Sequence, residues 1–395
     1  MLIRKTFKYR ILDPSKQVSS KLDWVLWKLR TLYNDALTER RLAYSMRGVS
    51  ISYYDQANQL PEIKEALPEY AEIGSHVLQD TLRRLDKAFQ AFFRRVKRGE
   101  KAGFPRYQGR GRFDSFTYPD IAGWKLEGDV LTLSKIGTLK IKLHRPIEGR
   151  IKTVTIKREG EHWCACFSVE IQQEVAPVAI KREVGIDMGL EKFATLSNGE
   201  QIANPRFFRL SADNLAVKQQ ALSRCVRGSN RRNKVRKQVA AWHRKVANQR
   251  RDFQHKLSRR LVDTYDAIYV EDLQITNMSK RAKSKVDEAA TDIQGETVYA
   301  HNGASSKSGL NKSIADAGWG YFLQMPTYKA ANAGKLLLKV NPKYTSQACS
   351  GCGTVVKKEL STRWHSCECG VELHRDHNAA LNIQRLGTSP RLSSA

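Results

Sequence analysis

Hydrophobic positions recur with two different periods along the first 172 residues, and the change of period divides this part of the chain. Apolar residues three or four apart, the spacing of one helix face, begin near Ser20 and again at Ser75. Alternation of apolar and polar residues predicts strands over 3–12 and repeatedly through 113–172, with glycine-containing turns between them. We therefore expect a small antiparallel β-barrel that includes the first strand, with the helices of 15–110 inserted into it.

The second half of the chain alternates short apolar runs with longer helical segments. Three apolar runs predict strands: VGIDMGLEKFATL (184–196, as a hairpin), AIYVEDL (267–273) and LLLKV (336–340). Helices are predicted over 218–260 with a turn near 228–233, from Ser313 to about Ala333, and from Asp376 onward. Together with the first half, this pattern predicts a multidomain α+β protein.

One polar stretch, 279–311, has no apolar period. A stretch of this length without structure inside a domain usually indicates a mobile functional loop or disorder. Because it closely follows the strand of 267–273, it is a candidate lid over a site near that strand.

The charge of the chain indicates a polyanionic partner. Lys and Arg number 68 against 40 Asp and Glu, which gives a net charge of +28. The segment 218–260 holds fifteen basic residues and one acid, yet it keeps an apolar stripe, so it predicts a packed helix that lies along nucleic acid. Candidate contacts on this segment and on the helix that starts at Ser75 are Arg231, Arg232, Lys234, Arg236, Lys237, Arg83, Arg84 and Lys87. The basic stretch 99–111, with interleaved aromatics, is either a further contact or a linker.

Hydropathy argues against a membrane protein. No window of about 18 apolar residues is present, and the N-terminal residues lack the continuous apolar core of a secretory signal. We therefore expect a cytoplasmic, nucleoid-associated protein.

Four of the seven cysteines cluster near the C-terminal end. Cys349 and Cys352 have the spacing of a zinc knuckle, and Cys367 and Cys369 supply a second pair whose spacing is one residue shorter than usual. We predict one structural Zn²⁺ held by four thiolates, with His365 as an alternative ligand in case the short knuckle strains one thiolate. Two further cysteines, Cys164 and Cys166, share one face of a predicted strand and are interpreted as core thiols.

Three carboxylates are the candidate catalytic residues. Asp187 and Glu271 each lie in an apolar strand-like run, and Asp376 opens an apparent helix. Burial of such acids is costly unless they are paired or bind metal. If they converge, they suit two Mg²⁺ ions about 4 Å apart, one to activate water and one to stabilise the leaving oxygen of a phosphodiester. Asp272 is the rival of Glu271, and strand alternation allows only one of the two to face the site.

These motifs, taken together, resemble the TnpB family of transposon-encoded, RNA-guided nucleases. GIDMG, the YVEDL strand and the tail C-x-x-C…C-x-C-G…RDHNAALNI resemble the three RuvC motifs and the embedded zinc finger of that family. AGFPRY and SIADAGWGYF also look like family features. The chain departs from the family at His374, where the family often has Asp, and at the shortened second knuckle; neither change removes Asp187, Glu271 or Asp376.

The resemblance implies a ribonuclease-H-like (RuvC) domain with an inserted zinc finger. The implied domains are a wedge β-barrel (1–14 and 111–180), a helical recognition lobe (15–110), the nuclease (181–345 and 371–395) and a zinc-finger insertion that binds target nucleic acid (346–370). It further implies an RNA-guided, Mg²⁺-dependent DNA endonuclease that binds one guide RNA derived from a transposon end, as a monomer, and cuts double-stranded target DNA beside a short flanking motif. By position, candidate readers of that motif are Tyr53, Gln79 and Thr117.

Two other functions use the same features. A transposase would use the three acids to join strands, with a 3′-hydroxyl as nucleophile. A repressor would bind guide RNA and DNA without cutting; the intact acids argue against it, because a retired nuclease need not retain them.

Overall fold

The structure, a computed structural model, describes residues 2–291, 297–359 and 361–392. The chain forms two compact units, Met1–Glu174 and Val175–Ala395, and each is described by itself. Within the described ranges no helix is both long and apolar enough to cross a membrane.

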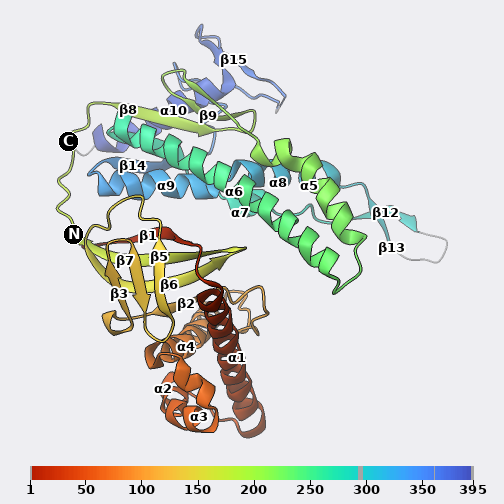
Figure 1. The fold of residues 1–395 in the computed structure, drawn as a ribbon. Coiled ribbons are helices and arrows are strands. Elements are labelled where there is room, and N and C mark those ends of the chain that lie inside the picture. Colours follow the sequence, from red (N-terminus) through yellow and green to blue (C-terminus); the bar gives the residue numbers. More distant parts are fainter. Residues whose placement is uncertain (1, 292–296, 360, 393–395) are drawn as a thin grey trace. The chain divides into compact units, whose positions relative to one another are not determined.

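The first unit is built on a seven-stranded antiparallel sheet (Figure 1). Its order is β2 (Ser115–Tyr118), β6 (Arg150–Glu159), β7 (His162–Gln172), β1 (Leu2–Leu12), β5 (Gly137–Ile141), β4 (Val130–Leu133) and β3 (Trp124–Glu127), with the short helix η2 (Ile121–Gly123) before β3. The expectation that the first strand joins this sheet is confirmed, because β1 pairs with both β7 and β5. The order is open, with β2 and β3 at its edges, and no described pairing closes it into the barrel that we expected.

Between β1 and β2 the chain forms helices up to Lys97. They are α1 (Lys16–Arg47), α2 (Tyr53–Asn58), α3 (Leu60–Ala66), η1 (Pro68–Glu72) and α4 (Ser75–Lys97). Helix α1 begins earlier than predicted because the Ser15 side chain accepts a hydrogen bond from the Val18 backbone N–H at 3.2 Å. The helices and the sheet share one core, in which Leu29, Leu82 and Phe167 are fully buried.

The second unit contains a five-stranded mixed sheet. Its order is β10 (Gln201–Ala203), β9 (Lys192–Leu196), β8 (Glu183–Met188), β11 (Ala267–Glu271) and β14 (Leu336–Val340). Strands β8, β11 and β14 are parallel to one another, and β9 and β10 are antiparallel additions at one edge. The hairpin predicted over 184–196 is confirmed as β8 and β9; the edge strand β10 was not predicted.

Two helix predictions for this unit are wrong. The helical hairpin is α5 (Phe207–Ser223) and α6 (Asn230–Thr264), and it turns earlier than 228–233 because the Ser229 hydroxyl caps α6 by accepting from the Arg232 backbone N–H. The helix expected from Ser313 is two helices, α8 (Ala304–Ala317) and α9 (Trp319–Asn332), because Gly318 between them has a left-handed backbone (φ 68°).

The stretch 279–311 is also more ordered than its composition indicates. It follows α7 (Ile275–Met278) and contains β12 (Lys285–Thr291) and β13 (Thr297–Ala300), which pair as a hairpin, and the start of α8. Residues 292–296, at the tip of this hairpin, lie outside the described residues. The idea that the stretch closes over a site stays a prediction.

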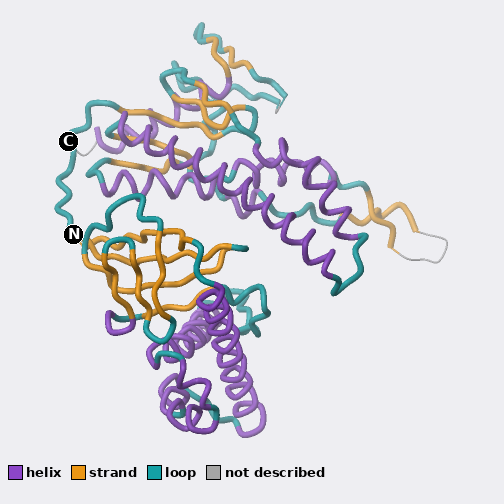
Figure 2. The backbone as a smooth tube through the Cα atoms, viewed as in Figure 1, coloured by secondary structure: helices purple, strands orange, loops and turns teal. Residues whose placement is uncertain are grey.

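Helices cover both faces of the five-stranded sheet (Figure 2). Val184, Ile186, Ile268 and Val270 point to one face and pack in a core with residues of α6 and α9. The other face carries α10 (Arg375–Leu392), which contacts β8, β11 and β14. The hairpin of β15 (Trp364–Ser366) and β16 (Glu372–His374) leads directly into α10.

Close approach of α10 to the sheet depends on two glycines. A Cβ on Gly185 in β8 would lie 2.1 Å from the carbonyl oxygen of Ala380, and one on Gly387 in α10 would lie 2.0 Å from the ring of Tyr269. Gly185 and Tyr269 lie two residues before Asp187 and Glu271 on their strands, so both acids share the face that α10 covers.

Candidate functional site

The three candidate carboxylates come from three different elements. Asp187 lies near the end of β8, Glu271 is the last residue of β11, and Asp376 lies in the first turn of α10. The parallel register sets Val270 opposite Ile186, so the next residues, Glu271 and Asp187, lie side by side at the carboxyl edge of the sheet. The start of α10 brings Asp376 to the same place, where a Cβ on Gly189 would lie 4.0 Å from its carboxylate.

Burial and the two neighbouring acids act on the ionisation of Asp187. Burial raises the pKa of Asp187 well above its usual value, and the charges of Glu271 and Asp376 raise it further. The guanidinium of Arg375 and the Met188 backbone N–H act in the opposite direction. Burial also raises the pKa of Glu271, whose residue is only 8% exposed.

A divalent cation suits this donor set. Carboxylates that repel one another when ionised are stabilised in the charged form by a cation between them. Oxygen ligands of this kind are those that Mg²⁺ prefers. The acids are nevertheless less tightly gathered than the cysteines described below, which form the one group of clustered ligand atoms found among the described residues.

Asp272, the rival of Glu271, has a different environment. Its carboxylate accepts a hydrogen bond from Lys339 Nζ at 3.1 Å, and its side chain is 48% exposed. Of the two neighbours, Glu271 is therefore the buried acid that faces Asp187.

His374, where the chain departs from the family pattern, caps the start of α10. Its Nδ1 accepts a hydrogen bond from the Asp376 backbone N–H at 3.3 Å. A carboxylate could accept the same bond, as capping Asp side chains do. His374 therefore caps the helix and leaves the Asp376 carboxylate in the group of three acids.

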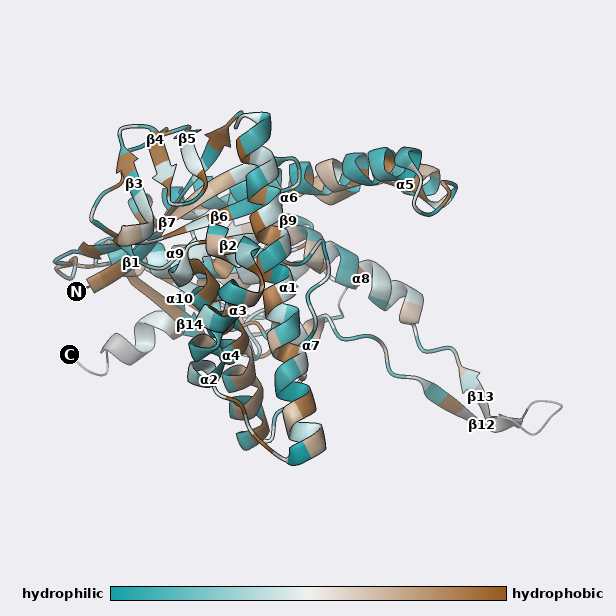
Figure 3. Cartoon of the chain, turned by 60° about the horizontal axis from the view of Figure 1, so that its bottom comes forward, coloured by the Kyte–Doolittle hydropathy of each residue, from teal (hydrophilic) through white to brown (hydrophobic). Residues whose placement is uncertain are grey.

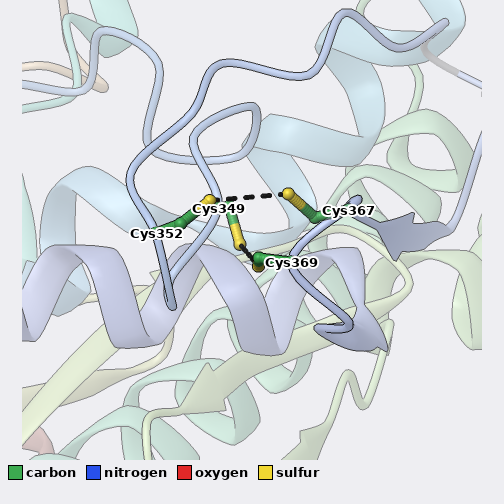
Figure 4. Close-up of side chains that lie close together, drawn as sticks. All are labelled: Cys349, Cys352, Cys367 and Cys369. Carbon is green, nitrogen blue, oxygen red and sulfur yellow. Dashed lines mark hydrogen bonds between the residues drawn. The ribbon is translucent and has the colours of Figure 1, made fainter.

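The four predicted zinc ligands lie together (Figure 4). All four sulfur atoms lie within 4.8 Å of one another, with Cys349 and Cys369 in contact at 3.5 Å and Cys352 and Cys367 also at 3.5 Å. The shortened second knuckle closes through Gly370, whose φ of 86° permits the tight turn. Four thiols at these separations fit a tetrahedral Zn²⁺ site.

The alternative ligand His365 and the two predicted core thiols lie outside this group. His365 is fully buried, but its Nδ1 contacts Lys358 Nζ and it does not belong to the thiol group. Cys164 is buried and Cys166 is half-buried in β7, and burial raises the pKa of both thiols, as in a core.

In the first unit the predicted nucleic-acid contacts gather on α2, α4 and β2. Arg83 lies over the ring of Tyr53, at 5.2 Å from its centroid, and both reach the surface of the unit. Arg84 donates to the Ser115 carbonyl and to the Thr117 hydroxyl, each at 2.6 Å, so its polar atoms already brace α4 on β2. Two further candidates on α4 lie at the surface, with Gln79 half-buried and Lys87 exposed.

In the second unit the basic candidates lie on the α5–α6 hairpin, which is mostly hydrophilic (Figure 3). Four of these basic candidates, near the start of α6, have exposed side chains: Arg231, Lys234, Arg236 and Lys237. Arg232 differs from them, because its guanidinium donates to the carbonyls of Leu222 and Cys225 and so ties α6 to the end of α5.

Sequence reasoning missed the polar residues that connect these centres. The hydroxyl of Thr345 donates to Glu271 Oε1 at 2.5 Å, and the side chains of Asn378 and Asn382 are buried against the segment that carries Cys349. The two asparagines lie four residues apart in RDHNAALNI, so a buried polar stripe on the predicted helix was a readable signal.

Comparisons with known proteins agree with one another. Residues 166–282 match a family described as probable transposase (OrfB_IS605), and residues 319–383 match the Cas12f1-like TNB domain. A protein of Escherichia coli K12 named "Putative RNA-guided DNA endonuclease InsQ" is 32% identical, over 97% of this chain and 92% of that protein. A Streptomyces pristinaespiralis protein named "Putative RNA-guided DNA endonuclease" is 33% identical, over 98% of this chain and 90% of that protein.

A solved structure shares the fold over almost the whole chain. The Cas12f1 protein in a complex with sgRNA and target DNA matches with a TM-score of 0.57 at 13% identity, over 97% of this chain and 99% of that one. The chain thus belongs to the TnpB-like family of transposon-associated, RNA-guided DNA endonucleases.

Proposed function

We propose that this protein is an RNA-guided DNA endonuclease that hydrolyses phosphodiester bonds with divalent metal ions at Asp187, Glu271 and Asp376. The observation that carries the proposal is the convergence of these acids from β8, β11 and α10, with a pKa of Asp187 raised by burial and by the other two carboxylates. The names of its relatives support the choice of substrate.

The strand order of the second unit supports a ribonuclease-H-like (RuvC) nuclease. The sheet has three antiparallel strands, followed along the chain by two strands that are parallel to the first. Acids lie at the carboxyl ends of the first and the fourth strand in chain order. This is the arrangement expected from the family resemblance. Within this proposal, 181–345 and 371–395 form the nuclease and 346–370 form a zinc finger. In the first unit, 1–14 and 111–180 form the wedge and 15–110 the recognition lobe.

The chemistry assigned to the protein's own residues is the binding and orientation of charge. The three carboxylates would hold two Mg²⁺ ions, which when bound activate a water molecule and stabilise the leaving oxygen. Thr345 fixes one oxygen of Glu271, and Arg375 moderates the negative charge around Asp187. The four cysteines would hold Zn²⁺ in a structural role.

The partners proposed are a guide RNA and double-stranded target DNA. Sequence would be read by base pairing with the RNA, while the protein reads the shape of the heteroduplex and a short flanking motif. We assign the flanking motif to the surface of Tyr53, Gln79 and Thr117. The exposed basic face of α6 would follow the phosphate backbone. One protein with one RNA, in the cytoplasm, is the assembly that we propose.

The test is a plasmid assay with the protein purified together with its co-expressed RNA. Cleavage that requires both a guide match and Mg²⁺, and that EDTA abolishes, is the expected result. Joining of transposon ends to a target would instead identify a transposase. Tight guide-dependent binding without any cleavage would identify a repressor.

A further inference from the structure

One buried hydroxyl donates a hydrogen bond to the Glu271 carboxylate. Thr345 is 4% exposed, and its hydroxyl lies 2.5 Å from Glu271 Oε1 and 3.1 Å from the Pro342 carbonyl oxygen. A hydroxyl has a single hydrogen to donate, and the shorter distance assigns it to the carboxylate. Charge-assisted bonds of this kind are roughly twice as strong as neutral ones.

The backbone before Thr345 is held in a conformation that few residues adopt. Tyr344 has a φ of 64°, which lies in the left-handed region that residues other than glycine rarely adopt. Its carbonyl accepts hydrogen bonds from the backbone N–H groups of Gln347 and Ala348, at 2.9 and 2.8 Å. The turn that places Thr345 is therefore maintained by its surroundings.

The surroundings that hold this turn are two asparagines of α10. Asn382 is 1% exposed, and its Nδ2 donates to the carbonyl oxygens of Thr345 at 2.9 Å and Ala348 at 2.7 Å. Asn378 is fully buried, donates to the same Ala348 oxygen at 2.7 Å, and accepts from the Ser350 backbone N–H at 2.9 Å. Both lie within two helical turns of Asp376, so one helix supplies a carboxylate and the support of another.

The same segment leads directly into the cysteine cluster. Ala348 and Ser350, which the asparagines hold, are the immediate neighbours of Cys349. The first thiol ligand and the support of Glu271 thus share one short stretch of chain, residues 344–350.

We propose that Thr345, held on α10 by Asn382, is a positioning residue that fixes Glu271 to receive a divalent ion. This inference rests on the proposed function of the three acids. It assigns a role to the buried asparagines of RDHNAALNI, which hydrolysis itself does not use.

The test measures Mn²⁺ binding to the full-length, RNA-free chain by electron paramagnetic resonance. Thr345→Val removes the hydroxyl and keeps the shape, and Thr345→Ser keeps the hydroxyl. Loss of an outer-shell partner lowers metal affinity by about 10–100-fold, so we expect Thr345→Val to weaken binding at least tenfold and Thr345→Ser to restore it. Thr388→Val is the matched control, because its hydroxyl lies 2.9 Å from the Gln384 carbonyl oxygen and 3.2 Å from the Glu183 carboxylate, away from the three acids.

Asn382→Ala provides a second, independent variant. If Asn382 acts through Thr345, the double variant binds Mn²⁺ no more weakly than Thr345→Val alone, whereas independent roles give additive losses. Thermal melting without added Mn²⁺ and the zinc content of each variant verify that the chain is folded.

The possible results separate the inference from the function on which it rests. If Asp187→Asn binds Mn²⁺ as tightly as the unaltered chain, the proposed function fails and the inference fails with it. If Asp187→Asn loses binding but Thr345→Val does not, or if Thr345→Ser loses as much as Thr345→Val, the inference alone is overturned.

Discussion

The surroundings of the Asp187 carboxylate oppose its ionisation more than they favour it. Its pKa is raised well above the usual value by burial and by Glu271 and Asp376. An acid whose pKa is raised by folding destabilises the folded state when it is charged. The penalty is absent below the unfolded pKa, near 3.8, and grows as the pH rises towards the folded pKa.

We therefore expect Asp187→Asn to be more stable than the unaltered chain at neutral pH in the absence of added divalent ions. The gain should shrink as the pH is lowered towards 4, where Asp187 itself becomes protonated, and Mg²⁺ should stabilise the unaltered chain but not the variant. For a unit of this size each kcal/mol shifts the melting temperature by about 2–4 °C, which calorimetry resolves. A variant that is less stable than the parent at neutral pH would contradict the repulsion described here.

Some residues of the candidate site could be proposed from the sequence, and others could not. Asp187 and Glu271 could be proposed as site residues from the sequence because an acid in an apolar run is conspicuous. Thr345 could not, because the hydrogen bond that gives it a role joins residues 74 positions apart and leaves no periodic trace in the sequence. The exclusion of Asp272 needed the structure, which gives that carboxylate a lysine partner.

At the scale of elements, the site depends on how closely α10 approaches the sheet. Gly185→Ala would place a methyl group 2.1 Å from a backbone oxygen of α10, which cannot yield as a flexible side chain would. Overpacking costs about 1–3 kcal/mol or more, and here it would also displace Asp376. We expect lower stability and loss of cleavage.

Gly309→Ala is the matched control for that change. It lies in α8 with open space around it, and Gly to Ala in a helix gains roughly 0.5–1 kcal/mol. Thermal melting and cleavage assays on the two variants check the prediction. Equal stabilities of Gly185→Ala and the parent would mean that α10 lies farther from β8 than described.

The cysteine cluster is a second element-scale feature. Cys349→Ser removes one of four gathered thiols, and we expect the purified protein to lose its zinc and to become less stable. Cys225→Ser, on a thiol that donates to the Ala221 carbonyl away from the cluster, should keep about one zinc per chain. Metal analysis by mass spectrometry measures both, and retention of zinc by Cys349→Ser would exclude it as a ligand.

Helices and strands were predictable where the hydrophobic periodicity was strong. They were not predictable where a single glycine sets the boundary of a helix. The hairpin of 184–196 and the strand of 267–273 follow from their apolar runs. The helix expected from Ser313 to about Ala333 divides at Gly318, because a left-handed residue ends one helix and starts the next. The polar stretch 279–311 forms strands through local pairing that its composition does not signal.

At the scale of the whole molecule, a net charge of +28 requires that nucleic-acid binding depend strongly on salt. Replacing Arg231 or Arg236 by Gln should weaken RNA binding and lower the slope of log affinity against log salt by about one for each phosphate that the variant no longer neutralises. Arg259→Gln is the control, because that guanidinium is paired with Asp263 in the same helix at 2.5 Å. Fluorescence anisotropy against labelled guide RNA measures the slopes; unchanged slopes for both α6 variants would contradict the proposed path of the backbone.

Our central proposal is that guided DNA cleavage occurs at the three converging acids. The most direct measurement is cleavage of a guide-matched plasmid in Mg²⁺ by the protein–RNA complex, with Asp187→Asn beside Asp272→Asn. We predict that Asp187→Asn binds RNA normally and cuts nothing above background, while Asp272→Asn, altered at an exposed carboxylate, cuts as the parent does. Cleavage by Asp187→Asn at the parental rate would contradict the account.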